Sequence, residues 1–152
     1  MSTDAQREID RCTASIINSP NDPLLFHTRG YYYGQIGEHL KAVDDYTESI
    51  RLKPEDFAAF ANRGLSYSNL GEYQKATLDY DGAIRLYPDP GPELYTARAI
   101  AHEALSMFEA AAEDRAMAEE ITRLDEEETT RLDELDELEE PVEETEESNH
   151  YY

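Results

Sequence analysis

Three pairs of arginine and aspartate at a constant spacing are the residues of this sequence best suited to chemistry. In each pair the aspartate follows the arginine by sixteen positions; the pairs are Arg29 with Asp45, Arg63 with Asp79, and Arg98 with Asp114. A guanidinium can hold a carboxylate through two parallel hydrogen bonds. We interpret these six residues as structural pairs that join two elements. The alternative that the sequence leaves open is an arginine array that binds phosphate or an acidic ligand.

Catalytic and metal chemistry have little support elsewhere in the sequence. The four histidines are scattered, at His27, His39, His102 and His150. The chain contains neither His-Glu-x-x-His nor Cys-x-x-Cys, the spacings that commonly hold a metal. Gly30, Gly34 and Gly37 resemble a phosphate loop only superficially, because the residues between them fit a helix. We therefore expect no enzyme activity, no cofactor and no metal site.

The constant spacing of the pairs reflects an internal repeat. Pro20, Pro54 and Pro88 lie 34 residues apart, and residues 27–54 match residues 61–88 at thirteen of 28 positions. Chance does not produce such agreement. The arginine and aspartate of each pair must therefore lie on two elements that recur from one unit to the next.

Two complete units carry one pattern of aromatic, glycine, alanine and proline residues. The first unit has Phe26, Gly30, Tyr33, Gly37, Ala42, Tyr46 and Pro54. The second has Phe60, Gly64, Tyr67, Gly71, Tyr73, Ala76, Tyr80, Ala83 and Pro88. This pattern resembles the tetratricopeptide repeat, whose unit is a helix-turn-helix. The resemblance covers roughly residues 5–118, and it implies an all-α fold that forms a right-handed superhelical array.

The resemblance divides the chain into five segments. They are a half-repeat capping helix in 1–22, a first repeat in 23–56, a second in 57–91, a degenerate third repeat with a capping helix in 92–124, and an acidic helix extension with a disordered tail in 125–152. Caps, glycines and prolines predict helices near 5–18, 23–35, 39–52, 56–69, 73–86, 92–105 and from 108 onward. The third repeat has Ser106 where the others have glycine.

Small residues inside the predicted helices indicate where helices approach closely. Glycine within a helix costs about 1 kcal/mol relative to alanine, so Gly30 and Gly64 make sense where a second helix needs the space. The single cysteine, Cys12, aligns with Tyr46 and Tyr80. We expect Cys12 to lie in the core, and it cannot form an internal disulfide.

Charge narrows the range of partners. The chain has 35 acidic residues against 13 lysines and arginines, a net charge of −22, and 16 of the acids lie in residues 119–147. Nucleic acid and anionic membranes attract clustered basic residues, so neither is an expected partner. The sequence has no long hydrophobic span and no signal-like start, and we expect a cytoplasmic protein.

The C-terminal segment supports two interpretations. The last helix can continue through Leu138 until Pro141 stops it. Met117, Ile121 and Leu124 are expected to seal the exposed flank of the third repeat. Beyond Asp125 the acidic stretch is either a solubilising cap that frays or a docking arm for a basic protein, and after Pro141 the composition is typical of disorder.

In the family that the sequence resembles, the first helices of successive units line a concave groove. The resemblance assigns to this groove Leu24, His27, Tyr31 and Gln35 of the first unit, Ala58, Ala61, Asn62, Leu65 and Asn69 of the second, and Glu93, Thr96, Ile100 and Glu103 of the third. One family variant binds the C-terminal carboxylate of heat-shock chaperones through a clamp of basic residues and two asparagines. This chain keeps only Asn62 of that clamp, which disfavours such a partner.

These observations predict a non-catalytic scaffold or adaptor that binds a peptide of a partner protein in the groove. An alternative is a small acidic chaperone for a secreted or basic client, because type III secretion chaperones are similar in size, charge and repeat number. A third possibility is an escort of basic proteins that works through the acidic tail alone.

Overall fold

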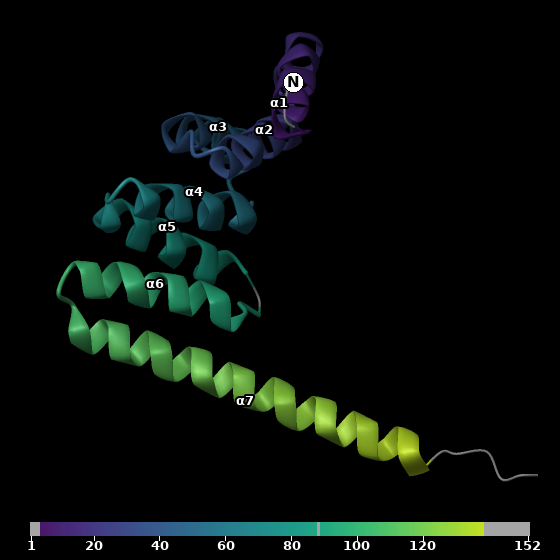
Figure 1. Ribbon diagram of the computed structural model, residues 1–152, viewed down its shortest axis with the longest axis vertical. Helices are drawn as coiled ribbons and strands as arrows, with labels where there is room; N and C mark the ends of the chain where they lie inside the picture. Colours follow the sequence, from purple (N-terminus) through teal and green to yellow (C-terminus); the bar gives the residue numbers. More distant parts are fainter. Residues whose placement is uncertain (1–3, 88, 139–152) are drawn as a thin grey trace, which may run out of the picture.

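Seven helices make up the part of the chain that the computed structural model describes, residues 4–87 and 89–138 (Figure 1). They are α1 (Asp4–Asn18), α2 (Pro23–Gln35), α3 (His39–Leu52), α4 (Phe57–Asn69), α5 (Tyr73–Leu86), α6 (Pro92–Ala104) and α7 (Phe108–Leu138). No strand occurs in these residues. The predicted all-α class is confirmed, and the predicted helix bounds agree to within one residue. The prediction of disorder after Pro141, and His150, lie outside the described residues.

The helices form three antiparallel pairs, α2 with α3, α4 with α5, and α6 with α7, which stack into a curved array (Figure 1). α1 packs on α2 in the way that α3 packs on α4, so it acts as the second helix of a unit that lacks its first. The first helices also contact one another across units, α2 with α4 and α4 with α6. These three helices therefore share one side of the array.

Helix ends follow the chemistry of their residues. The Asp22 side chain accepts a hydrogen bond from the backbone amide of Leu24 at 3.0 Å, and Pro23 begins α2. Gly37 and Gly71 adopt left-handed backbone angles, with φ of 79° and 76°, in the turns inside the first two units. The third unit makes the same turn with Ser106 at φ 59°. A side chain in this region is strained, so the degenerate turn carries a cost that the other two avoid.

Close approach of the two helices explains Gly30 and Gly64 in the first helices. A Cβ atom placed on Gly64 would lie 2.9 Å from Cε1 of Tyr80, and one on Gly30 would lie 3.2 Å from Cε1 of Tyr46. Each tyrosine ring occupies the space that a larger residue would need. The corresponding residue of the third unit is Ala99, which is fully buried.

The core is built from small residues and a few tyrosines along the axis of the array. Ala42, Ala59, Ala76, Ala83, Ala99 and Ala101 are fully buried. Cys12 is 3% exposed, so its predicted core position is confirmed, and burial raises the pKa of its thiol.

α7 packs on α6 through a narrow face of small and ionised residues: Ala111, Asp114 and Ala118 are buried. Met117 and Leu124 are 46% and 51% exposed, so the prediction that they seal the third repeat is wrong for these two residues. Helical geometry puts Met117 about 100° around the axis from Ala118, away from α6. The 31 residues of α7 span about 46 Å at 1.5 Å per residue, and the helix extends well beyond the stack (Figure 1).

None of the described helices combines the length with the apolar composition needed to cross a membrane.

Candidate functional site

The structure forms all three arginine–aspartate pairs. Arg63 donates to both carboxylate oxygens of Asp79 at 2.8 Å, through Nε and Nη2. Arg29 holds Asp45 in the same way at 2.8 and 2.7 Å. The three aspartates are at most 5% exposed. Hydrogen bonds to the aspartates raise the pKa of the three arginines against the opposing effect of burial. This geometry favours the structural interpretation, because the guanidiniums are already engaged.

Each arginine also reaches back to the preceding unit, a connection that was not predicted from the sequence. Nη1 of Arg29 donates to Oγ1 of Thr13 at 3.2 Å, and Nη1 of Arg63 donates to Oγ1 of Thr47 at 3.0 Å. In the third unit Nη1 of Arg98 donates to Oδ1 of Asp81 at 2.6 Å. The acceptors Thr13, Thr47 and Asp81 recur every 34 residues, so the repeat alignment contained the signal. The pairs therefore join units as well as the helices within a unit.

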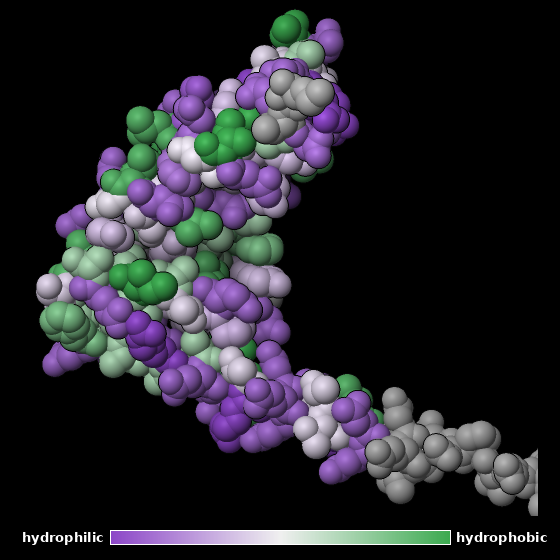
Figure 2. Space-filling model, in the orientation of Figure 1, coloured by the Kyte–Doolittle hydropathy of each residue, from purple (hydrophilic) through white to green (hydrophobic). Residues whose placement is uncertain are grey.

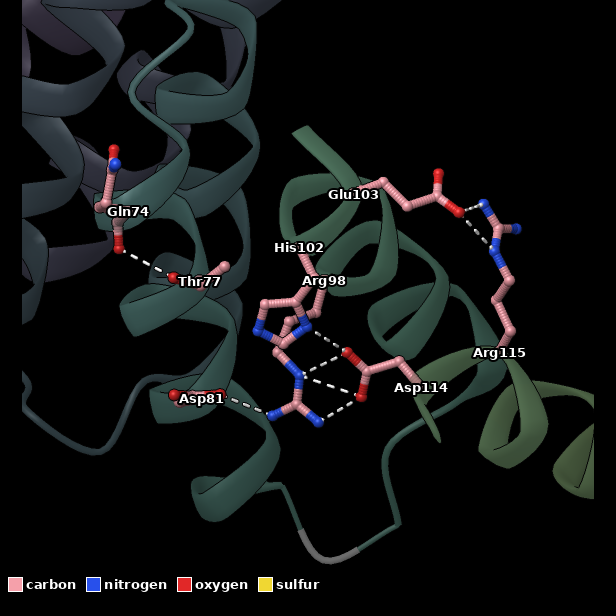
Figure 3. A network of polar contacts seen from close by, with 8 residues as sticks. All are labelled: Gln74, Thr77, Asp81, Arg98, His102, Glu103, Asp114 and Arg115. Carbon is pink, nitrogen blue, oxygen red and sulfur yellow. Dashed lines mark hydrogen bonds and ion pairs between the residues drawn. The ribbon is translucent and has the colours of Figure 1, made fainter. Parts of the chain in front are cut away.

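The third unit surrounds its pair with additional polar contacts (Figure 3). Nδ1 of His102 lies 3.0 Å from Oδ2 of Asp114, on the same carboxylate that Arg98 holds. Nearby, Arg115 of α7 donates to Oε1 of Glu103 at 2.7 Å (Figure 3). Glu103, a predicted groove residue, is thus occupied by an ion pair with α7.

Two clefts lie on either side of α4, on the side of the array that the first helices share. The α2–α4 cleft has a volume of about 260 Å³, and the predicted residues Tyr31, Gln35, Asn62, Leu65 and Asn69 line it. The α4–α6 cleft has a volume of about 280 Å³, and the predicted residues Ala61, Asn62, Leu65 and Glu93 line it. Asn62 and Leu65 border both clefts, so we treat the two as one groove.

The remaining predicted groove residues line neither cleft: Leu24, His27, Ala58, Thr96, Ile100 and Glu103. Leu24 and Ile100 are exposed. The ring of His27 is instead held between units. Its Nδ1 lies 3.4 Å from Oδ2 of Asp56, and it meets the ring of Tyr46 edge-on at 5.5 Å. Its Nε2 also lies 3.4 Å from Nδ2 of Asn62. These contacts leave His27 less available to a ligand than its position in the sequence suggests.

Tyr31 is a large side chain that the α2–α4 cleft presents to solvent. It is 47% exposed, and its hydroxyl accepts a hydrogen bond from Nε2 of Gln35 at 2.8 Å. Tyr32 supports its ring edge-on at 5.4 Å. An aromatic ring held in this way offers apolar area at little cost in conformational entropy.

Comparison with protein families identifies the repeat. The model of the tetratricopeptide repeat matches residues 25–56 and 57–90, the two complete units. Residues 25–90 are therefore two repeats of the tetratricopeptide repeat family. No curated protein matches its sequence at a significant level.

Solved tetratricopeptide repeat structures share the fold. The crystal structure of MamA superposes with a TM-score of 0.74 at 21% identity, over 78% of this chain and 69% of that one. The first tetratricopeptide domain of Spaghetti (RPAP3), bound to the HSP90 peptide SRMEEVD, gives 0.62 at 23% identity, over 64% and 77%. YrrB, described as having an unusual peptide-binding site, gives 0.67 at 17% identity, over 74% and 57%. At these identities the likeness concerns the fold alone.

Several aromatic residues that line this tetratricopeptide repeat groove were not predicted as groove residues, among them Phe57 and Tyr87. Phe57 and Tyr87 line the α4–α6 cleft and stack face to face, with ring centroids 4.1 Å apart and planes 4° apart. Tyr80, Leu94 and Ala97 complete its apolar lining. Phe57 and Tyr87 were missed because they lie at the end and the junction of helices, outside the repeat pattern.

A signal for both aromatic residues was present in the alignment of the units. Phe57 stands where the other units begin their first helix with Pro23 and Pro92, and Tyr87 stands where the first unit has Lys53. These two departures from the neighbouring units thus add aromatic walls to the α4–α6 cleft, beside the repeated Tyr80.

Proposed function

We propose that this protein is a non-catalytic interaction scaffold that binds an extended or helical peptide of a partner protein in the groove. The observation that carries this proposal is the pair of clefts on either side of α4, joined by Asn62 and Leu65. Neighbouring clefts with apolar walls and a few polar groups are typical of sites that take peptides.

The polar groups of the groove suit the backbone of a peptide. Gln35, Asn62 and Asn69 present amides beside the α2–α4 cleft, and each amide can both donate and accept a hydrogen bond. Tyr31 and Leu65 supply exposed apolar area next to them. The peptide would therefore gain binding energy from apolar side chains, while the amides fix its register.

The charge of the groove disfavours an acidic peptide. Among the residues that line the two described clefts there is no lysine or arginine. Glu93 lies at the α4–α6 cleft instead. A ligand like the HSP90 peptide bound by the RPAP3 domain, with the sequence SRMEEVD, carries acids that this groove does not complement.

The test is to select a displayed library of random twelve-residue peptides on the full chain and to measure the best binder by calorimetry. Leu65→Ala should weaken binding by tenfold or more, because it removes the side chain shared by both clefts. Leu78→Ala is the matched control, since Leu78 is an exposed leucine of α5 outside both clefts. Equal affinities for the wild type and Leu65→Ala would exclude the groove as the site.

The second candidate function is a chaperone or escort for a basic client that uses the projecting part of α7. Past Ala118, the last buried residue described in α7, this helix carries acids together with the half-exposed Leu124, Leu132 and Leu135. Hydrophilic residues dominate its visible surface (Figure 2). Truncation after Asp125 separates the two functions. Loss of binding to a lysine-rich amphipathic peptide, with groove binding intact, would support the escort.

A further inference from the structure

The α4–α6 cleft has the size and lining of a pocket for one large side chain. Phe57, Tyr87, Leu94 and Leu65 give it apolar walls, and its volume is about 280 Å³. By comparison, a cavity of about 150 Å³ lined by apolar residues can hold a molecule the size of benzene. A bulky aliphatic or aromatic side chain therefore fits this cleft.

The aromatic walls formed by Phe57 and Tyr87 are not needed to form a repeat unit. The first and third units begin their first helices with proline, and the first unit closes with Lys53 at the position of Tyr87. Both helical pairs nevertheless form with the same arginine–aspartate contact. The stacked rings of Phe57 and Tyr87 thus distinguish this cleft from the rest of the array.

A carboxylate without a cationic partner lies at the same cleft. Glu93 is on the first turn of α6, and its side chain folds back over Gly91, where an added Cβ would lie 2.7 Å from Oε2 of Glu93. Two other acids near the groove are engaged, Glu103 by Arg115 and Asp56 by His27. In the described part of the chain no cation pairs with Glu93, and none lines its cleft. The site therefore has an acidic group available to a ligand.

We propose that the α4–α6 cleft binds a bulky apolar side chain of the peptide and that Glu93 selects a lysine or arginine next to it. This inference rests on the proposed function and names the chemistry of its ligand. Apolar burial supplies most of the affinity, and the carboxylate supplies the preference for a basic residue. The predicted ligand is opposite in charge to the acidic HSP90 peptide bound in the RPAP3 structure.

The experiment selects the random twelve-residue library separately on the wild type, Glu93→Gln, Glu93→Lys and the control Glu113→Gln, an exposed acid of α7. The wild type and the control should enrich peptides with a bulky apolar residue beside lysine or arginine. Glu93→Gln should keep the apolar preference and lose the basic one, and Glu93→Lys should enrich aspartate or glutamate instead. A peptide selected on the wild type should bind Glu93→Gln about tenfold more weakly.

A further variant tests the apolar pocket at a position where the other two units have proline. Phe57→Pro installs the residue that begins α2 and α6, and proline is well tolerated at the first position of a helix. It should weaken the selected peptide by about tenfold or more while the circular dichroism spectrum stays unchanged. Unchanged affinity for Phe57→Pro would overturn the assignment of the pocket.

The outcomes separate this inference from the function on which it rests. One outcome is that binding depends on Leu65, while the wild type and Glu93→Gln enrich peptides with the same preference for basic residues. This outcome would overturn the role of Glu93 and leave the scaffold function intact. Absence of any enriched peptide, or equal binding to Leu65→Ala, would overturn both proposals together.

Discussion

The second and third units hold their two helices together with the same ion pair but surround it differently. In the second unit Gly64 faces the ring of Tyr80, and Gly71 makes the turn. In the third unit Ala99 and Ser106 take the places of these glycines, and Arg115 takes the place of the tyrosine. The third unit also brings His102 to the aspartate that its arginine holds.

This difference separates what a unit must have from what it can exchange. The bidentate contact between arginine and aspartate is present in both units, with the same spacing of sixteen residues. The third unit lacks both the glycine and the tyrosine, which agrees with a close contact in which a Cβ atom on Gly64 would meet the ring of Tyr80. We infer that the ion pair specifies the helical pair, whereas the glycine–tyrosine contact is one of several ways to fill the interface.

The largest expected effect comes from breaking the pair in the second unit. Arg63→Leu leaves the buried Asp79 without its cation and should destabilise the protein by about 3 kcal/mol. Arg98→Leu should cost less, because His102 remains 3.0 Å from Asp114. Urea unfolding followed by circular dichroism measures both. An equal cost for the two variants would show that His102 does not compensate, and no cost for Arg63→Leu would remove the structural role of the series.

The next effect tests whether the glycine depends on the ring. Gly64→Ala should destabilise the second unit by about 1–2 kcal/mol, since overpacking outweighs the gain of about 1 kcal/mol in helix propensity. Ala99→Gly, the reverse change in the third unit, should cost about 1 kcal/mol through propensity alone. Thermal unfolding of both variants gives the comparison. If Gly64→Ala proved stabilising, the close contact with Tyr80 would not limit the residue at this position.

A smaller effect of opposite sign is expected at the strained turn. Ser106→Gly should stabilise the protein by about 0.5–1 kcal/mol, because glycine adopts the left-handed backbone of this turn without strain. Gly71→Ser in the second unit should be destabilising by a similar amount. Chemical denaturation midpoints report both changes, and a loss of stability in Ser106→Gly would contradict the account of the degenerate turn.

The smallest effect is expected at the far end of α7. Truncation after Asp125 removes residues that are exposed wherever their side chains are described, so amide exchange in residues 23–86 should be unchanged. Truncation after Asp114 should in contrast expose α6, because it removes the buried Ala118. Faster exchange throughout residues 23–86 in the chain truncated after Asp125 would mean that the projecting helix supports the whole array.

The sequence by itself determined the repeat, the seven helices and the three ion pairs. These features are local or periodic: glycine and proline mark the helix ends, and a period of 34 residues repeats each contact. Residues that occupy corresponding positions in equivalent units meet equivalent elements, so one comparison between units predicts many contacts.

Only the tertiary structure decided which groove residues meet and which are already occupied. Glu103 pairs with Arg115 and His27 contacts Asp56, and both contacts depend on how one helix lies against the next. The stack of Phe57 on Tyr87 joins residues thirty positions apart that belong to no repeated pattern. The physical reason is that these contacts join side chains of different helices that no repeated position pairs, so they depend on how the surrounding helices pack.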